Sequence, residues 1–155
     1  MLLSHKHSTR GKMLSIVAAA AVLLAALIFL RRAADEHRNA ETRAERVAFA
    51  AALGWELDPE SEETARVDLP EELSDVLADY NALQLRCGYD LSPLCGKSCR
   101  QYSYRVLNAP QEDEIVLLTL YVDRGRVVGG DIHSTALDGF MIGLQANPAA
   151  AGNAQ

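Results

Sequence analysis

The sequence predicts an α+β protein, in which one N-terminal transmembrane helix precedes a small domain with an antiparallel sheet of three to five strands and a packed helix. Three observations predict this fold class. An uncharged apolar run covers residues 13–30, apolar side chains recur every three or four residues over 70–86, and from Lys97 onward the period changes to two.

The apolar run over 13–30 reads MLSIVAAAAVLLAALIFL and contains no charged residue. At about 1.5 Å of rise per residue, a helix of this length covers roughly 27 Å, close to the hydrocarbon thickness of a bilayer. A helix also satisfies its backbone polar groups internally, as lipid requires. We therefore expect a transmembrane helix over 13–30, with the lipid bilayer as its partner.

A cleaved secretory signal is the alternative for the same run. The apolar part of such a signal usually has about 7–15 residues, fewer than here, and small residues follow it. Arg31 and Arg32 stand at that place instead, although Ala33 and Ala34 offer small residues beyond them. The sequence therefore favours a retained signal-anchor.

Basic residues flank the run on both sides, three within twenty residues before it and five after it. Counted literally, the positive-inside rule places the C-terminal domain in the cytoplasm. Three of the five, however, lie in a predicted helix of the folded domain, and long domains cross membranes despite their charge. We expect a single-pass protein of the cell membrane, with a cytoplasmic N-terminus and an extracytoplasmic C-terminal domain.

Charge is distributed unevenly along the chain. Residues 33–155 contain 21 acids against 10 bases, whereas residues 1–32 contain no acid. Phosphate backbones repel such an acidic domain, so no nucleic-acid partner is expected. The chain is expected to divide into a short basic tail (1–12), the transmembrane helix (13–30), a helical stalk (31–43), the α+β domain (44–144) and a disordered tail (145–155).

Two helices are predicted beyond the apolar run, over 33–53 and 70–86. In the first, alanines three and four residues apart form a stripe along one face, and Gly54 ends the helix. In the second, Pro70 suits the first helical position and Gly88 follows the end. The apolar face of the second helix contains Leu73, Val76, Leu77, Tyr80 and Leu83.

The strands are predicted from alternating or continuous apolar residues. The run over 114–122 is almost continuously apolar, which indicates a central strand buried on both faces. A tight hairpin at Asp123–Arg126, with Gly125 in the left-handed conformation, leads into the next strand, and a closing turn is expected at 137–141. The expected strands are 55–58, 65–69, 99–108, 114–122 and 126–133.

Five short motifs follow one another between Ala44 and Leu144. They are Gly54-Trp55-Glu56, Gly88-Tyr89-Asp90-Leu91, Tyr104-Arg105-Val106-Leu107-Asn108, Gly129-Gly130-Asp131 and Leu137-Asp138-Gly139-Phe140-Met141. Together they resemble the domain of unknown function 4830 family, a group of bacterial proteins, mostly with an N-terminal membrane segment. The resemblance implies a bacterial, Gram-positive source and brings no activity, because the family has none assigned. Neither the cysteines nor His133 match a family pattern.

Three cysteines, Cys87, Cys95 and Cys99, lie within thirteen residues. Outside the cytoplasm, two of them can form a disulfide and leave one spare thiol. Free, partly buried thiols are the second alternative. A zinc site is the third, and it would need His133 as a fourth ligand.

Asp131, His133 and Asp138 form the one polar cluster near a strand end that suggests chemistry. Asp131 and His133 share a strand face, and a histidine–carboxylate pair is common acid–base equipment. A structural role is favoured, because Asp131 follows two glycines and Asp138-Gly139 is typical of a turn. The usual enzymatic motifs are absent from the sequence. We predict no catalytic, cofactor-binding or metal-binding residue, and we expect Trp55 in the core.

The predicted function is that of a non-enzymatic, membrane-tethered extracytoplasmic domain that binds an envelope protein, a membrane protein, a peptide or a small ligand. One alternative is a hydrolase or thiol-dependent enzyme that uses Cys99 or Asp131 with His133. A second alternative is an assembly subunit whose anchor helix pairs with another membrane protein through its alanine face.

Overall fold

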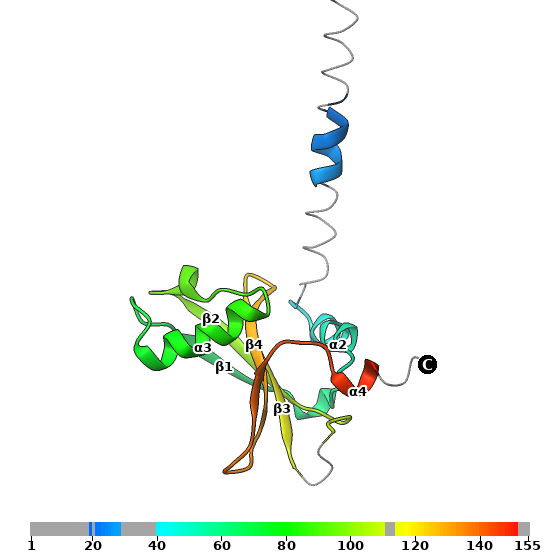
Figure 1. Ribbon diagram of the computed structural model, residues 1–155, viewed down its shortest axis with the longest axis vertical. Helices are drawn as coiled ribbons and strands as arrows, with labels where there is room; N and C mark the ends of the chain where they lie inside the picture. The colour runs from blue at the N-terminus through cyan, green and yellow to red at the C-terminus, as the bar shows by residue number, and fades with distance from the viewer. Residues whose placement is uncertain (1–18, 20, 29–39, 111–113, 152–155) are drawn as a thin grey trace, which may run out of the picture. The chain divides into compact units, whose positions relative to one another are not determined.

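The computed structural model describes residues 19, 21–28, 40–110 and 114–151. The chain separates into two compact units, residues 1–37 and 38–155, and each is treated by itself. The second unit contains the α+β domain, with a twisted sheet between helical layers (Figure 1).

An antiparallel sheet of five strands forms the centre of the domain, and its strands lie side by side in chain order. The predicted antiparallel sheet is therefore present, and the hairpin at Asp123–Arg126 joins two of its strands. Arg124 and Gly125 both take positive φ in this turn, 49° and 75°. The strands are β1 (Glu63–Asp68), β2 (Ser98–Arg105), β3 (Val116–Asp123), β4 (Arg126–Ser134) and β5 (Met141–Gly143).

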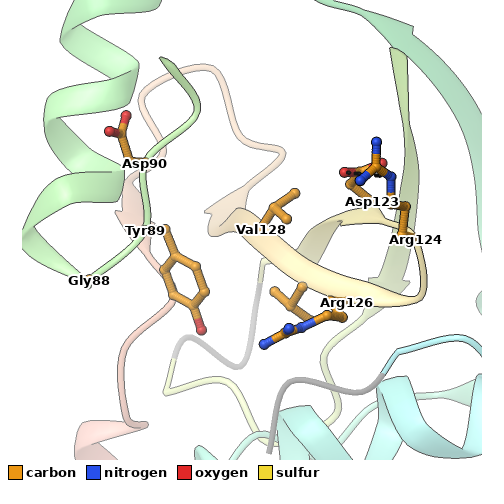
Figure 2. Close-up of a pocket in the computed structure, with 8 residues that line it drawn as sticks. Gly88, Tyr89, Asp90, Asp123, Arg124, Arg126 and Val128 are labelled. Atoms are coloured by element: carbon orange, nitrogen blue, oxygen red, sulfur yellow. Dashed lines mark ion pairs between the residues drawn. The ribbon is translucent and has the colours of Figure 1, made fainter. Parts of the chain in front are cut away.

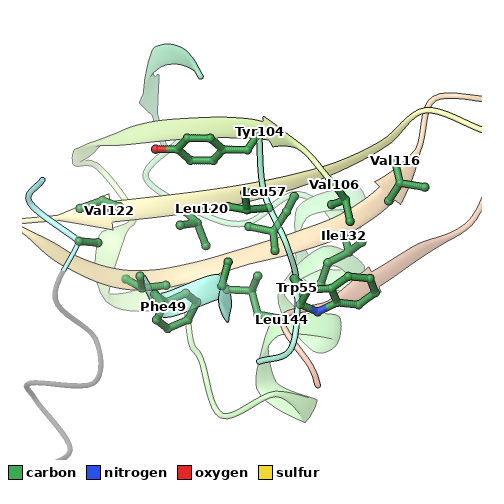
Figure 3. Close-up of a cluster of buried hydrophobic side chains, with 14 residues drawn as sticks. Phe49, Trp55, Leu57, Tyr104, Val106, Val116, Leu120, Val122, Ile132 and Leu144 are labelled. Carbon is green, nitrogen blue, oxygen red and sulfur yellow. The ribbon is translucent and has the colours of Figure 1, made fainter. Parts of the chain in front are cut away.

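The main core lies between one face of the sheet and helix α2 (Arg43–Ala52). Figure 3 shows Phe49 and Trp55 packed with Leu120 and Ile132 of the central strands. Trp55 is almost completely buried, and its indole N–H donates a hydrogen bond of 2.8 Å to the carbonyl of Gln145. The prediction that Trp55 lies in the core is confirmed.

Arg46 fastens α2 to this face of the sheet. The residue is 4 % exposed, and its guanidinium stacks 3.7 Å above the ring of Tyr102 and donates to the hydroxyl of Tyr104 at 2.7 Å. It also donates to a carboxylate oxygen of Glu62 at 2.7 Å. Burial opposes ionisation of Glu62, but the hydrogen bonds from Tyr104 and Arg46 outweigh it and lower the pKa of Glu62. A paired, hydrogen-bonded charge therefore stands inside the core.

Helix α3 (Asp75–Arg86) packs on the opposite face, over β4 and β5. The carbonyl oxygen of the Gln84 side chain accepts a hydrogen bond of 2.9 Å from the backbone N–H of Gly130. The helix lies so close to β5 that a Cβ at Gly143 would come within 2.5 Å of the Cys87 sulfur. The predicted packing of this helix across one face is therefore present.

The start of α3 differs from the sequence prediction. Helical structure begins at Asp75 after Ser74, not at Pro70, because the carbonyl of Pro70 accepts a hydrogen bond from the N–H of Gly96. Val76, expected on the buried face, is 78 % exposed, because the side of α3 that meets the sheet contains Tyr80, Asn81 and Gln84 instead. The predicted strand at 55–58 is reduced to a single bridge between Leu57 and Val106.

Both ends of the domain extend beyond the range expected for it, 44–144. Ala40 is completely buried in the core, and α2 begins after Thr42, which forms a capping box with Glu45. Residues 40–42 of the predicted stalk are not helical, and residues 31–39 lie outside the described residues. At the other end, buried Asn147 donates to the carbonyl of Gly54 and precedes the short helix α4 (Pro148–Ala151). The predicted disordered tail is thus described as far as residue 151.

The fold class is corrected at the N-terminus. In the part of the chain that the structure describes, no helix combines the length and the apolar character needed to cross a bilayer, so the predicted fold with a transmembrane helix over 13–30 is wrong. The described stretch 21–28 is helical, but eight residues span only about 12 Å. The rest of the range, apart from residue 19, lies outside the described residues. The predicted location at the cell membrane stays a prediction.

Candidate functional site

Asp131 and His133 on β4 lie side by side on the face of the sheet that α3 covers in part. Their contact is short, 2.6 Å between Oδ1 of Asp131 and Nδ1 of His133. Asp131 is only 3 % exposed, whereas the His133 side chain is 26 % exposed. The two-residue period predicted this shared face correctly.

Tyr80 of α3 is the third member of the cluster with Asp131 and His133, and it contacts Asp131 from the helix that covers this face. Its hydroxyl donates a hydrogen bond of 2.5 Å to Oδ2 of Asp131, and its ring meets the ring of Tyr121 edge-on at 6.2 Å. Burial, reinforced by the charge of Asp131, raises the pKa of Tyr80 far above its usual value. The phenol therefore stays protonated and serves Asp131 as a donor.

The cluster continues into the sheet through paired residues. Asp131 pairs with Thr119 in the register, and the hydroxyl oxygen of Thr119 lies 3.0 Å from that of Ser103 on β2. Both oxygens of the buried carboxylate thus have partners, Tyr80 and His133, and the hydroxyl pair of Thr119 and Ser103 lies beside them on the next two strands. The bond from Tyr80 to this satisfied carboxylate helps to fix the position of α3 on the sheet.

Acid–base chemistry at His133 would need a reactive group next to the imidazole. The residues paired with or next to His133 across the sheet are Leu117 and Met141, both apolar. Asp138, the third member of the predicted cluster, is exposed in the turn between β4 and β5. The structure brings Asp131 and His133 together but supplies this pair with no paired nucleophile in the sheet.

All three cysteines are unpaired. Cys87 adjoins the pair, because its sulfur lies against Gly143, the register partner of Asp131, whereas Cys99 lies away from it. Arg105 on β2 is level with His133, because both residues pair with Leu117. Cys99 is six residues from Arg105, so it lies about 20 Å along the strand from this level. Burial, together with Asp123 and Asp68, raises the pKa of Cys99 and so disfavours its thiolate. Cys87 lies instead at the end of α3. In the described residues, no three His, Cys, Asp or Glu side chains converge to hold a metal.

Two hollows flank the turn between β3 and β4, and both include Asp123 and Arg124. The larger has a volume of about 500 Å³ and reaches to the loop after α3. In Figure 2, Arg126 extends toward Tyr89 on one side of this hollow, while Asp123 and Arg124 lie together at the turn. The smaller hollow, about 230 Å³, is lined by Arg66, Ser98, Cys99, Arg100, Val122, Asp123 and Arg124.

The far end of the sheet, away from these hollows, carries exposed apolar side chains on the face of His133. Leu117 pairs with His133, and His133 pairs with Met141. The register, continued by one pair through the bond from Val106 N–H to the Val116 carbonyl, places Leu107 opposite Ile115. We call this group the apolar end; it contains the exposed Leu107, Ile115, Leu137 and Met141 and the partly exposed Leu117.

Comparison with known proteins gives no match: no family model, no curated protein and no solved structure corresponds to this chain. The resemblance to the domain of unknown function 4830 family therefore stays a prediction.

Two groups at these sites were not found from the sequence. Tyr80 was assigned to an apolar helix face, because helical spacing does not distinguish a buried ring from a buried hydroxyl. Arg66 and Arg100 lie on different strands, and only the register shows that they are direct neighbours. The sequence could have shown only which face of its own strand each arginine occupies, from the two-residue period.

Proposed function

We propose that this domain is a non-enzymatic binding or interaction domain, and that a partner protein or peptide binds at the apolar end of its sheet. The observation that carries the proposal is the exposure of large apolar side chains there. Leu107, Ile115 and Met141 are 55 %, 50 % and 52 % exposed, and Leu137 in the adjoining turn is completely exposed. Exposed apolar groups that adjoin one another are typical of interaction sites.

The proposal is supported by the position of these residues in the fold. Leu117 and Met141 flank the partly exposed His133, so this surface extends over β3, β4 and β5. Helix α3 contacts β4 and β5 at Gly130, Asp131 and Gly143. The pair of His133 and Met141 lies two residues farther along these strands, beyond those contacts. Covering each half-exposed side chain would contribute roughly 1 kcal/mol, about half the value for complete burial.

Location enters this proposal only as a prediction from sequence. An extracytoplasmic place at the cell membrane would make envelope proteins and peptides the available partners.

Photo-crosslinking in cells tests the proposal. A photoreactive amino acid is placed at Met141 in the full chain and, as a matched control, at Val76, which is more exposed but lies on α3. We expect a discrete crosslinked product from position 141 only, and its loss when Ile115→Glu is added. Equal crosslinking from both positions, or a product that survives Ile115→Glu in a folded protein, would contradict the proposal.

An enzyme that uses Asp131 and His133 is the second candidate, and the short contact between the two side chains favours it. Two observations weigh against an enzyme. The residues next to His133, Leu117 and Met141, are apolar, and each carboxylate oxygen of Asp131 already has a hydrogen-bond partner. A hydrolase screen of the full chain with His133→Gln decides the matter, because an enzyme would lose its activity while the fold remained intact.

A further inference from the structure

Three arginines from different parts of the chain line the smaller hollow beside the turn between β3 and β4. Arg66 is on β1, Arg100 is on β2 and Arg124 is in the turn. Arg66 and Arg100 are direct partners in the register, so their Cβ atoms are about 5 Å apart. Arg100 pairs in turn with Val122, two residues before Arg124. Three guanidinium groups therefore arise from neighbouring positions around a space of about 230 Å³.

The three arginines of this hollow are only partly compensated by carboxylates. Like charges directly opposite each other on antiparallel strands repel. Arg66 is compensated by Asp68 at 3.1 Å, and Asp123 is 4.0 Å from Arg124. Arg100, by contrast, has no carboxylate within ion-pair distance among the residues that the structure describes, although its side chain is exposed.

Acidic residues are abundant elsewhere in the domain, so this gathering of bases is unusual for the chain. Residues 40–155 contain 9 bases against 19 acids, and three of those bases line one hollow. Arg124 also takes a φ of 49°, and within the described ranges it is the one non-glycine residue with positive φ. Glycine or asparagine suits such a turn position better than arginine, so the arginine is held there at a conformational cost.

We propose that this hollow binds a phosphate group. Arginine presents several N–H donors in a planar fork that matches phosphate oxygens, and charge-assisted bonds of this kind are strong. Three arginines on β1, β2 and the turn offer more donors than a planar carboxylate needs, since a single arginine can hold a carboxylate, and so they suit a tetrahedral anion better. Asp123 also lines the hollow and opposes the anion, which sets the phosphate on the side of Arg66 and Arg100. The site lies at the opposite end of the sheet from the apolar end and does not depend on the function proposed there.

The test uses the full chain labelled with ¹⁵N at the arginine Nε atoms, titrated with inorganic phosphate against chloride at constant ionic strength. We expect saturable shifts of the Nε–H signals of Arg66, Arg100 and Arg124. Arg100→Gln should weaken phosphate binding at least about tenfold, because it removes a charge-assisted donor pair. Arg105→Gln, an exposed arginine on the same strand but outside the hollow, should leave the binding unchanged.

A second arm distinguishes a soluble phosphate from a lipid headgroup. The same proteins are mixed with phosphatidylcholine vesicles that contain or lack phosphatidic acid. Binding that depends on phosphatidic acid and on Arg100 supports a lipid phosphate, and a saturable response to inorganic phosphate alone supports a soluble one. No saturable shift and no Arg100-dependent vesicle binding would overturn the proposal, as would equal losses in Arg100→Gln and Arg105→Gln. Crosslinking at Met141 is a separate readout, so failure at one site is distinguishable from failure at the other.

Discussion

Replacement of Arg46 by alanine is expected to cost the domain about 3 kcal/mol of unfolding free energy. The guanidinium donates to Tyr104, to Glu62 and to the carbonyls of Ala40 and Glu41, all at 2.7–3.0 Å. Breaking one partner of a buried ion pair typically costs about 3–5 kcal/mol. The lower value applies here because Glu62 keeps its hydrogen bond from Tyr104 and a weaker contact with Arg43 at 3.6 Å.

The assay is urea unfolding of the full chain, followed by the fluorescence of Trp55. Arg43→Ala serves as the matched control, since Arg43 is on the same helix and pairs at 3.2 Å with Glu60, which is 86 % exposed. An exposed pair of this kind contributes less than about 1 kcal/mol. In thermal unfolding, the melting temperature of the Arg46 variant should be roughly 10–15 °C below that of the wild type for a domain of this size.

A double variant separates the charge from the packing. Arg46→Met with Glu62→Gln removes both charges, so most of the lost stability should return, as is typical when an apolar group replaces a buried pair. A loss below about 1 kcal/mol for Arg46→Ala, or equal losses at positions 43 and 46, would refute the reasoning that the buried network holds α2 on the sheet.

Three further perturbations test the fold. The pKa of Glu62 is lowered in the folded state. Its ionised carboxylate therefore stabilises the fold above the unfolded pKa, and this stability is lost as pH falls through the folded pKa. Glu62→Gln should flatten the acid side of the curve of unfolding free energy against pH, and an unchanged acid side would count against this. Gly130→Ala would place a Cβ 2.1 Å from the carbonyl oxygen of Thr119, and a loss of about 3 kcal/mol or failure to fold is expected in thermal unfolding. Asp131→Asn should lower stability by about 1–3 kcal/mol, because the amide cannot serve both Tyr80 and His133 as the carboxylate does. A variant as stable as the wild type would show that the bond from Tyr80 to Asp131 does not hold α3.

The long strands could be predicted because their chemistry is local. Alternation over 99–108 and the apolar run over 114–122 each follow from which faces are buried, and β2 and β3 lie within or close to those ranges. β5 has three residues, too few to show a period, and it was expected only as a turn. The start of α3 was misplaced because Pro70 bonds to Gly96, a contact between residues far apart in sequence.

The candidate sites were predictable only where one strand carries the whole pair. Asp131 and His133 are two residues apart, so their common face follows from the strand period. Tyr80 reaches Asp131 across 51 positions of sequence, and Arg66 meets Arg100 only through the register. Such contacts depend on how elements pack, which a single sequence does not specify locally.

The outermost strands determine how this sheet behaves beside another copy of itself. β1 is an edge with unpaired backbone groups on one side, and its side chains are mostly exposed and include Glu63, Arg66 and Asp68. β5, at the other edge, has only three residues. A charged edge strand and a very short edge strand are both poor templates for pairing with another strand. The two edges of this sheet therefore disfavour edge-to-edge pairing with a strand of another copy.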